Sequence, residues 1–140
     1  MTLGQASYST MTMNQDIGFA SVAADHSAMG AVVWLTSTAS MNEADAAMAR
    51  WQPANDTTEQ YVVGWLEPPS THKLARVDSA GKFTEQPMDV SAKAHWGERD
   101  DPFRVHVNGD IVWASFDAAG STTLHFSRLS SGGTAMCASF

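Results

Sequence analysis

The 140-residue chain has little cysteine and no long apolar run, and each shortage excludes a class of protein. Its one cysteine, Cys137, has no partner for an internal disulfide, and it cannot build a zinc cage of several thiolates. No apolar run approaches the roughly 18 residues of a membrane helix. Residues 1–18 lack the basic and apolar regions of an intact secretory signal. We therefore expect no membrane insertion.

Positive charge is also scarce. Only 8 Lys and Arg stand against 15 Asp and Glu, which gives a formal net charge of −7. A nucleic-acid backbone or an anionic lipid surface would need clustered cations, so neither partner is expected. Hydrophobic residues still make up 44% of the chain. We therefore expect residues 1–140 to form one domain, or one portion of a repetitive domain.

What the sequence does contain is a series of short runs rich in valine and aromatic residues, each bounded by turn residues. Such residues fit the pleated surface of a sheet, and short bounded runs are typical of antiparallel strands. The fold class that this pattern predicts is all-β, built of antiparallel meanders. The expected strands are residues 30–38, 60–67, 72–77, 103–107, 110–116 and 122–129.

Asn108 and Gly109 predict a tight hairpin, because a two-residue type I′ turn needs positive φ at both central positions. This turn would pair Val105 with Val112. One face of the hairpin would then lie in the core: Phe103, Val105, Val107, Val112, Ala114 and Phe116. The opposite face would be less buried: Arg104, His106, Ile111, Trp113 and Ser115.

One stretch predicts a helix instead. Ser40 and Glu43 have the spacing of a capping box, and the residues after them are good helix formers. We expect a short surface helix over residues 41–50, in a connection between strands. Its apolar face would carry residues spaced three or four apart: Met41, Ala44, Met48 and Trp51.

Weak internal similarity indicates a repeat, with two possible registers of about 39 and about 50 residues. The shorter register lays LARVDSAGKFT on WASFDAAGSTT. The longer register lays residues 61–81 on 110–133 with a lengthened loop, and it pairs Trp65 with Trp113. A third copy would place Trp34 in the tryptophan position.

The repeated pattern is an aromatic strand such as VVW, a polar turn, and a strand ending in Arg, an apolar residue and Asp or Ser before a Gly turn. It is carried by residues 32–34, 62–65, 74–81, 109–113 and 124–133. This pattern resembles the blades of bacterial β-propellers. The segment SFDAAGSTT also resembles the Asp-box turn of sialidase-like propellers, with one residue inserted before Gly120 and Leu124 in place of the tryptophan.

The resemblance implies about three blades, over residues 28–60, 61–109 and 110–140. Three blades do not close a ring of the usual four to eight. A propeller would therefore need self-association or a longer chain. The alternative fold is a single β-sandwich or barrel.

The loop before the hairpin gathers side chains suited to a ligand, and binding residues often lie on loops that rigid elements anchor. A tryptophan ring can stack on a sugar, while charged groups form hydrogen bonds with the sugar hydroxyls. The expected ligand-binding residues are Trp96, His95, Arg99 and Trp51. Glycoside hydrolysis would need two carboxylates about 5–10 Å apart, for which the candidates are Glu98, Asp100 and Asp101.

The five histidines lack the spacing of a helical metal site. His106 and His125 would lie on adjacent strands and could approach each other, but we expect no metal and no cofactor. We predict a non-catalytic binding or assembly module that recognises carbohydrate or a protein surface through its strand-connecting loops, as a homo-oligomer. The alternatives are a glycoside hydrolase-like or other hydrolytic propeller unit and a purely structural, self-associating subunit.

Overall fold

The computed structural model describes residues 15–53, 56–97, 102–116 and 122–130, together with the backbone of residues 135–138. Within these ranges the secondary structure consists of ten strands and contains no helix. The described part of the chain accordingly has no helix long and apolar enough to cross a membrane. The prediction of an all-β, antiparallel fold is therefore confirmed.

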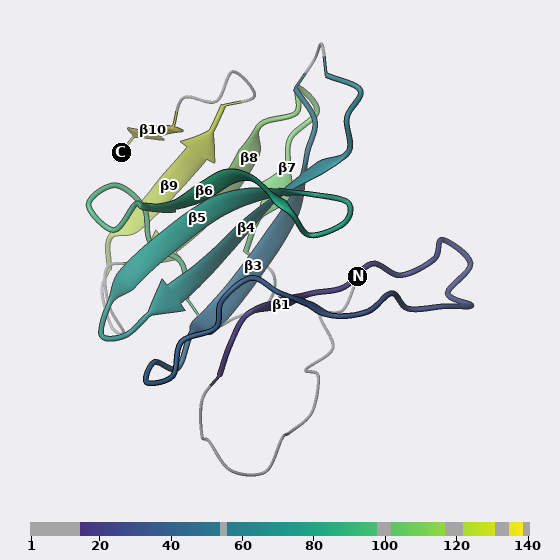
Figure 1. Cartoon of the computed structure of the whole chain (residues 1–140). Helices are drawn as coiled ribbons and strands as arrows, with labels where there is room; N and C mark the ends of the chain where they lie inside the picture. Colours follow the sequence, from purple (N-terminus) through teal and green to yellow (C-terminus); the bar gives the residue numbers. More distant parts are fainter. Residues whose placement is uncertain (1–14, 54–55, 98–101, 117–121, 131–134, 139–140) are drawn as a thin grey trace.

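The strands form three antiparallel sheets that lie one above another (Figure 1). The first sheet is a two-stranded hairpin of β1 (Gly18–Phe19) and β2 (Val33–Trp34). The second is a four-stranded meander of β3 (Ala44–Trp51), β4 (Gln60–Glu67), β5 (Thr71–Asp78) and β6 (Phe83–Asp89). The third is a four-stranded meander of β7 (Arg104–Val105), β8 (Ile111–Phe116), β9 (Leu124–Leu129) and β10 (Ala135–Ala138).

The middle sheet, β3–β6, separates two apolar clusters. Its face toward the β1–β2 hairpin packs Val63, Trp65, Ala75 and Val77 against Ile17, Phe19 and Leu35. Its face toward the β7–β10 sheet packs Ala47, Ala49, Trp51, Val62 and Leu74 against Ala94, Trp96, Phe103, Ile111 and Trp113. Because strand residues alternate between faces, β4 is apolar on both sides and is covered on both.

The prediction of a helix over residues 41–50 is wrong, because most of this segment lies in β3. The buried residues of β3 repeat every second position: Ala47, Ala49 and Trp51. Glu43 does not close a capping box. It is buried and accepts a hydrogen bond from Thr38 Oγ1 at 2.8 Å. Pairing with β4 therefore overrides the helical propensity of the alanines.

The chain does reverse at Asn108 and Gly109, but the register differs from the predicted one by one residue. Val105 pairs with Ile111 rather than with Val112. The backbone N–H of His106 bonds the carbonyl of Asp110, and Gly109 has a φ of +86°. The loop thus has three residues, with the glycine in the left-handed position that such loops require.

A slip of one residue exchanges the two faces of a strand. The prediction that Val112, Ala114 and Phe116 face the core is therefore wrong. The buried residues of β8 are Ile111, Trp113 and Ser115. On the other arm of the hairpin Phe103 is buried as predicted, while Val105 is half-exposed and Val107, at the tip, is 96% exposed.

The longer of the two repeat registers matches the order of the strands. Residues 61–81 cover β4 from its second residue onward and all of β5, and the described part of 110–133 contains β8 and β9. In each case these are the second and third strands of their sheet. In the shorter register, β5 and β6 would correspond to β8 and β9. The third and fourth strands of one sheet would then be matched with the second and third strands of the other. None of the described sheets closes into a barrel.

Candidate functional site

Of the predicted ligand-binding loop, only part lies among the described residues. Arg99 and all three candidate carboxylates, Glu98, Asp100 and Asp101, fall outside them, so the hydrolytic alternative stays a prediction. His95 is exposed, but Trp96 is only 3% exposed. The Trp96 ring contacts His72, Phe103 and Trp113 edge-on, with centroid distances of 4.7, 5.3 and 6.2 Å.

The polar atoms around Trp96 hold this connection against the sheets. Its indole Nε1 donates to the carbonyl of Asp45 at 2.9 Å, and its own carbonyl lies 3.0 Å from His72 Nε2. The indole of Trp113 donates to the carbonyl of His95 at 2.9 Å. The expectation that Trp96 offers a stacking surface to a sugar is therefore wrong, because the ring is part of the core.

Trp51 is not on a binding surface either. It is the last residue of β3 and is almost fully buried between the two large sheets. The guanidinium carbon of Arg76 lies 5.5 Å from the centre of its ring, on the side where Arg76 pairs with Glu85. This cation–π contact and the burial explain the tryptophan as packing.

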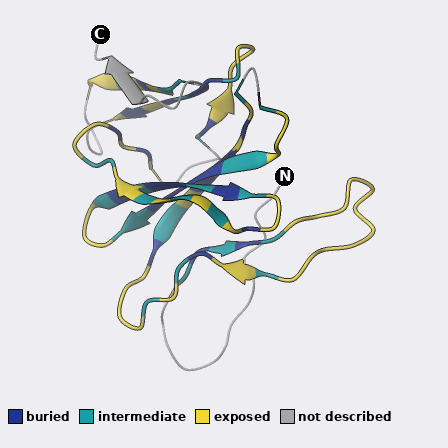
Figure 2. Ribbon diagram, turned by 45° about the horizontal axis from the view of Figure 1, so that its top comes forward, coloured by how far each residue is buried: buried dark blue, intermediate teal, exposed yellow. Residues whose placement is uncertain are grey.

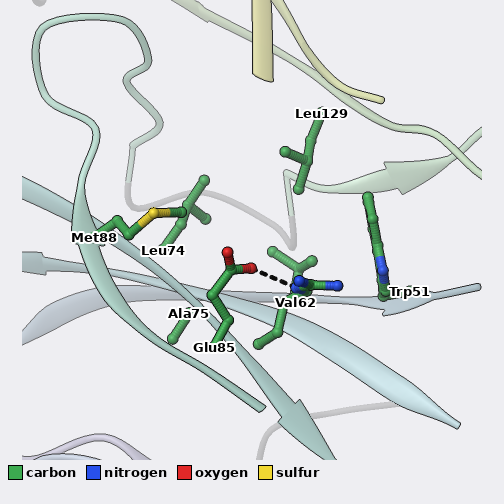
Figure 3. A pocket seen from close by; sticks show the side chains of 8 residues that line it. Trp51, Val62, Leu74, Ala75, Glu85, Met88 and Leu129 are labelled. Atoms are coloured by element: carbon green, nitrogen blue, oxygen red, sulfur yellow. Dashed lines mark hydrogen bonds and ion pairs between the residues drawn. The ribbon is translucent and has the colours of Figure 1, made fainter. Parts of the chain in front are cut away.

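A cleft lies beside Trp51, between β3–β6 and β9 (Figure 3). Its walls are mainly apolar and include the Arg76–Glu85 ion pair. The lining residues are Trp51, Val62, Leu74, Ala75, Arg76, Glu85, Met88 and Leu129. The cavity volume is about 30 Å³, whereas ligand pockets measure roughly 300–1,000 Å³. The cleft therefore has room for water but not for a sugar ring.

The histidine pair singled out in the sequence is not brought together by strand pairing. His106 directly follows β7 and His125 lies on β9, and β8 separates these two strands. Among the residues that the structure describes, no three His, Cys, Asp or Glu side chains are grouped so that they could hold a metal ion.

An exposed aromatic surface lies on the side of β7–β10 that faces away from β3–β6. We call it the outer face, and it consists of Arg104, Val112, Ala114, Phe116, Leu124, Phe126 and Arg128. Phe116, Phe126 and Leu124 are 56%, 51% and 37% exposed, respectively. Strand pairing aligns Phe116 with Leu124 and Ala114 with Phe126, so these side chains are cross-strand neighbours.

An ion pair anchors one side of the outer face. Asp110 is buried, and its Oδ2 accepts hydrogen bonds from Arg128 Nε at 2.6 Å and from Asn108 Nδ2 at 2.8 Å. The Arg128 side chain itself is about half exposed. The Arg128 guanidinium is thereby held beside the apolar residues, with its charge compensated by Asp110.

A second exposed face lies at the opposite end of the stack, on the β1–β2 hairpin. We call it the hairpin face, and it consists of Gly18, Val32 and Trp34. Gly18 pairs with Trp34, and a Cβ built on Gly18 would come within 2.8 Å of Val32 and 3.3 Å of the Trp34 ring. Trp34 is 55% exposed. Figure 2 shows that the long loop of this hairpin is exposed along its length.

The hairpin loop carries a carboxylate that stays ionised. Asp25 accepts hydrogen bonds from the hydroxyl of Ser27 at 2.6 Å and from its backbone N–H at 3.0 Å. These bonds stabilise the charged form and lower the pKa of Asp25. The loop is therefore negative at neutral pH.

The outer face was missed in the sequence because the predicted register placed Phe116 in the core. A usable signal was present in β8, whose residues Ile111–Phe116 are apolar at almost every position. A strand that is apolar on both sides is typical of a sheet covered on both faces.

Comparison of the chain with protein-family models, with curated proteins and with solved structures found no match.

Proposed function

We propose that this protein is a non-catalytic assembly module, which binds another copy of itself through the outer face. In this proposal the three stacked sheets are blade-like units of an incomplete propeller. The meander order of both large sheets and the contact between their first strands, β3 and β7, support the comparison with blades.

The observation that carries the proposal is the difference between β4 and β8. Both are second strands of four-stranded meanders, and both are apolar at positions facing either side. In β4 every residue from Val62 to Trp65 is buried, because a sheet lies on each side. In β8 only the side toward β3–β6 is covered. Two phenylalanines and a leucine are exposed together as cross-strand neighbours, and a contiguous apolar patch of this kind is often an interaction site.

The chemistry of the outer face favours protein over carbohydrate as its partner. A sugar site needs an accessible aromatic ring among hydrogen-bonding groups, whereas this surface is an apolar strip of Phe116, Leu124 and Phe126. Arg104 and Arg128 lie at its border, and aromatic residues and arginine are enriched in protein interfaces. An antiparallel sheet from a second copy would cover this strip in the way that β7–β10 covers β3–β6.

Sedimentation velocity of the purified chain and of Phe126→Glu tests the proposal. The wild-type chain should associate beyond its monomer mass of 15.0 kDa and dissociate on dilution. Phe126→Glu should be monomeric, because a charge would have to be buried in the contact. Val107→Glu is the matched control, since Val107 is exposed at the hairpin tip, away from the strip, and should associate like wild type.

A wild-type chain that stays monomeric at every concentration reached would overturn the proposal, and so would association of Phe126→Glu with wild-type affinity. Circular dichroism of each variant establishes that it is folded. If Phe126→Glu does not fold, Phe116→Ser serves in its place, because Phe116 is the more exposed of the two rings.

A further inference from the structure

We infer that the surface that receives the outer face is the hairpin face of the next copy, so that copies associate head to tail. This inference rests on the proposed function, and it adds the identity of the second surface. It makes the contact heterologous, with a different patch contributed by each partner.

The first argument is the direction in which the repeated tryptophans point. Trp65 on β4 faces the β1–β2 hairpin, which precedes its sheet in the chain. Trp113 on β8 faces β3–β6, which again is the preceding sheet. Trp34 on β2 points away from β3–β6, because its strand partner Gly18 lies between the inward-facing Ile17 and Phe19. All three tryptophans therefore point the same way along the stack.

The second argument is the direction of the paired arginines. Arg76 pairs with Val62 in the ladder and Arg128 pairs with Val112. Arg76 lies on the side of its sheet that the next sheet covers, where it reaches the ring of Trp51. Arg128 lies on the corresponding side of its own sheet, which is the outer face. The same side of each large sheet is thus the one that meets a following layer.

Together these directions make the hairpin face and the outer face the two ends of one stack of sheets. Trp34 is directed at a preceding layer, and the outer face is directed at a following layer. A second copy supplies both at once, since its hairpin follows the first copy's β7–β10 sheet. The ring of Trp34 would then meet the strip of Phe116, Leu124 and Phe126.

The pairing of the faces favours this arrangement over a symmetric contact between two outer faces. A symmetric contact would leave the hairpin face of each copy uncovered, with Trp34 exposed. The head-to-tail contact covers both faces, so that Trp34 meets a preceding layer as Trp65 and Trp113 do.

Mixing two disabled variants tests the inference. Trp34→Glu disables the hairpin face and Phe126→Glu disables the outer face, and each variant alone should be monomeric in sedimentation velocity. An equimolar mixture should associate, because the first variant keeps its outer face and the second keeps its hairpin face. Val107→Glu mixed with Phe126→Glu is the control for the added charge; its association should match that of wild type mixed with Phe126→Glu.

Different failures have different meanings. If Trp34→Glu associates like wild type while Phe126→Glu does not, the outer face binds another surface, and only the head-to-tail inference is overturned. The same holds if both variants are monomeric alone and their mixture also stays monomeric. A monomeric wild type overturns both the inference and the proposed function. Circular dichroism again establishes folding, and Trp34→Ser replaces Trp34→Glu if the latter does not fold.

Discussion

The ring of Trp96 lies directly against Gly64. A Cβ built on Gly64 would come within 2.8 Å of the ring carbon Cζ2 of Trp96 and within 2.9 Å of Phe103. Gly64 lies on β4, whereas Trp96 lies on the connection between β6 and β7. The missing side chain therefore makes room for the aromatic cluster that joins the two large sheets.

Gly64→Ala should destabilise the protein. The added methyl group forces the Trp96 ring to move, and insertion into a packed core costs roughly 1–3 kcal/mol. Urea denaturation followed by tryptophan fluorescence measures the loss. Gly97→Ala is the control, because a Cβ at Gly97 would meet nothing within 4 Å. Equal stability of the two variants would contradict the close contact between Gly64 and the Trp96 ring.

Trp96→Ala should cost far more stability than Trp34→Ala. Removal of a buried aromatic side chain costs roughly 3–5 kcal/mol, while Trp34 is half-exposed in the monomer and its loss should cost under about 1 kcal/mol. Thermal unfolding at a concentration where the chain is monomeric compares the two variants. A Trp96→Ala protein with an unchanged melting temperature would return Trp96 to the surface role that its loop first suggested.

Gly109→Ala should destabilise the β7–β8 hairpin by about 1–2 kcal/mol, the cost of placing a Cβ in the left-handed region. The φ of Gly109 is +86°. Gly109→Asn should lose less, because asparagine tolerates this region better than alanine. Thermal denaturation of the three proteins ranks them. Alanine as stable as glycine would mean that the turn does not have this conformation.

Asp25 should titrate below its ordinary pKa of 3.8, because the hydroxyl and backbone N–H of Ser27 bond its charged form. A carboxyl whose folded pKa is lowered stabilises the fold above the unfolded pKa, and this contribution is lost as pH falls through the folded pKa. Ser27→Ala should raise the pKa of Asp25 toward 3.8. NMR titration of the Asp25 carboxyl carbon measures both values.

Ser37→Ala is the control for that titration, since Ser37 is an exposed serine outside the loop and its loss should leave the pKa of Asp25 unchanged. A wild-type Asp25 that titrates at 3.8 or above would contradict the hydrogen bonds of the hairpin loop.

The strand content could be predicted from local sequence because short valine- and aromatic-rich runs have few other stable arrangements. The run at residues 60–67 coincides with β4, and 110–116 and 122–129 contain β8 and β9. β6 was missed, because Pro87 and its charged neighbours suit an edge strand and carry little β signal. The helix expected over 41–50 failed because pairing with β4 overrides the helical propensity of its alanines.

The candidate site depended on information that no local pattern contains. Whether Trp96 is a ligand platform or a core residue depends on what covers it, and the groups that cover it include Gly64 and Trp113, far away along the chain. Whether Phe116 faces the core or the solvent depends on whether the β7–β8 loop has two residues or three.

By itself, the amino-acid order determined that the chain pairs as antiparallel sheet and turns at Asn108 and Gly109, because backbone preferences and turn chemistry act over a few residues. Only the tertiary structure decided which side of β8 is covered and which tryptophans are buried. A strand such as β8, which is apolar on both sides, satisfies its local preferences equally well whichever side faces the core. The choice therefore falls to the sheet that packs against it, and it leaves Phe116, Leu124 and Phe126 facing outward.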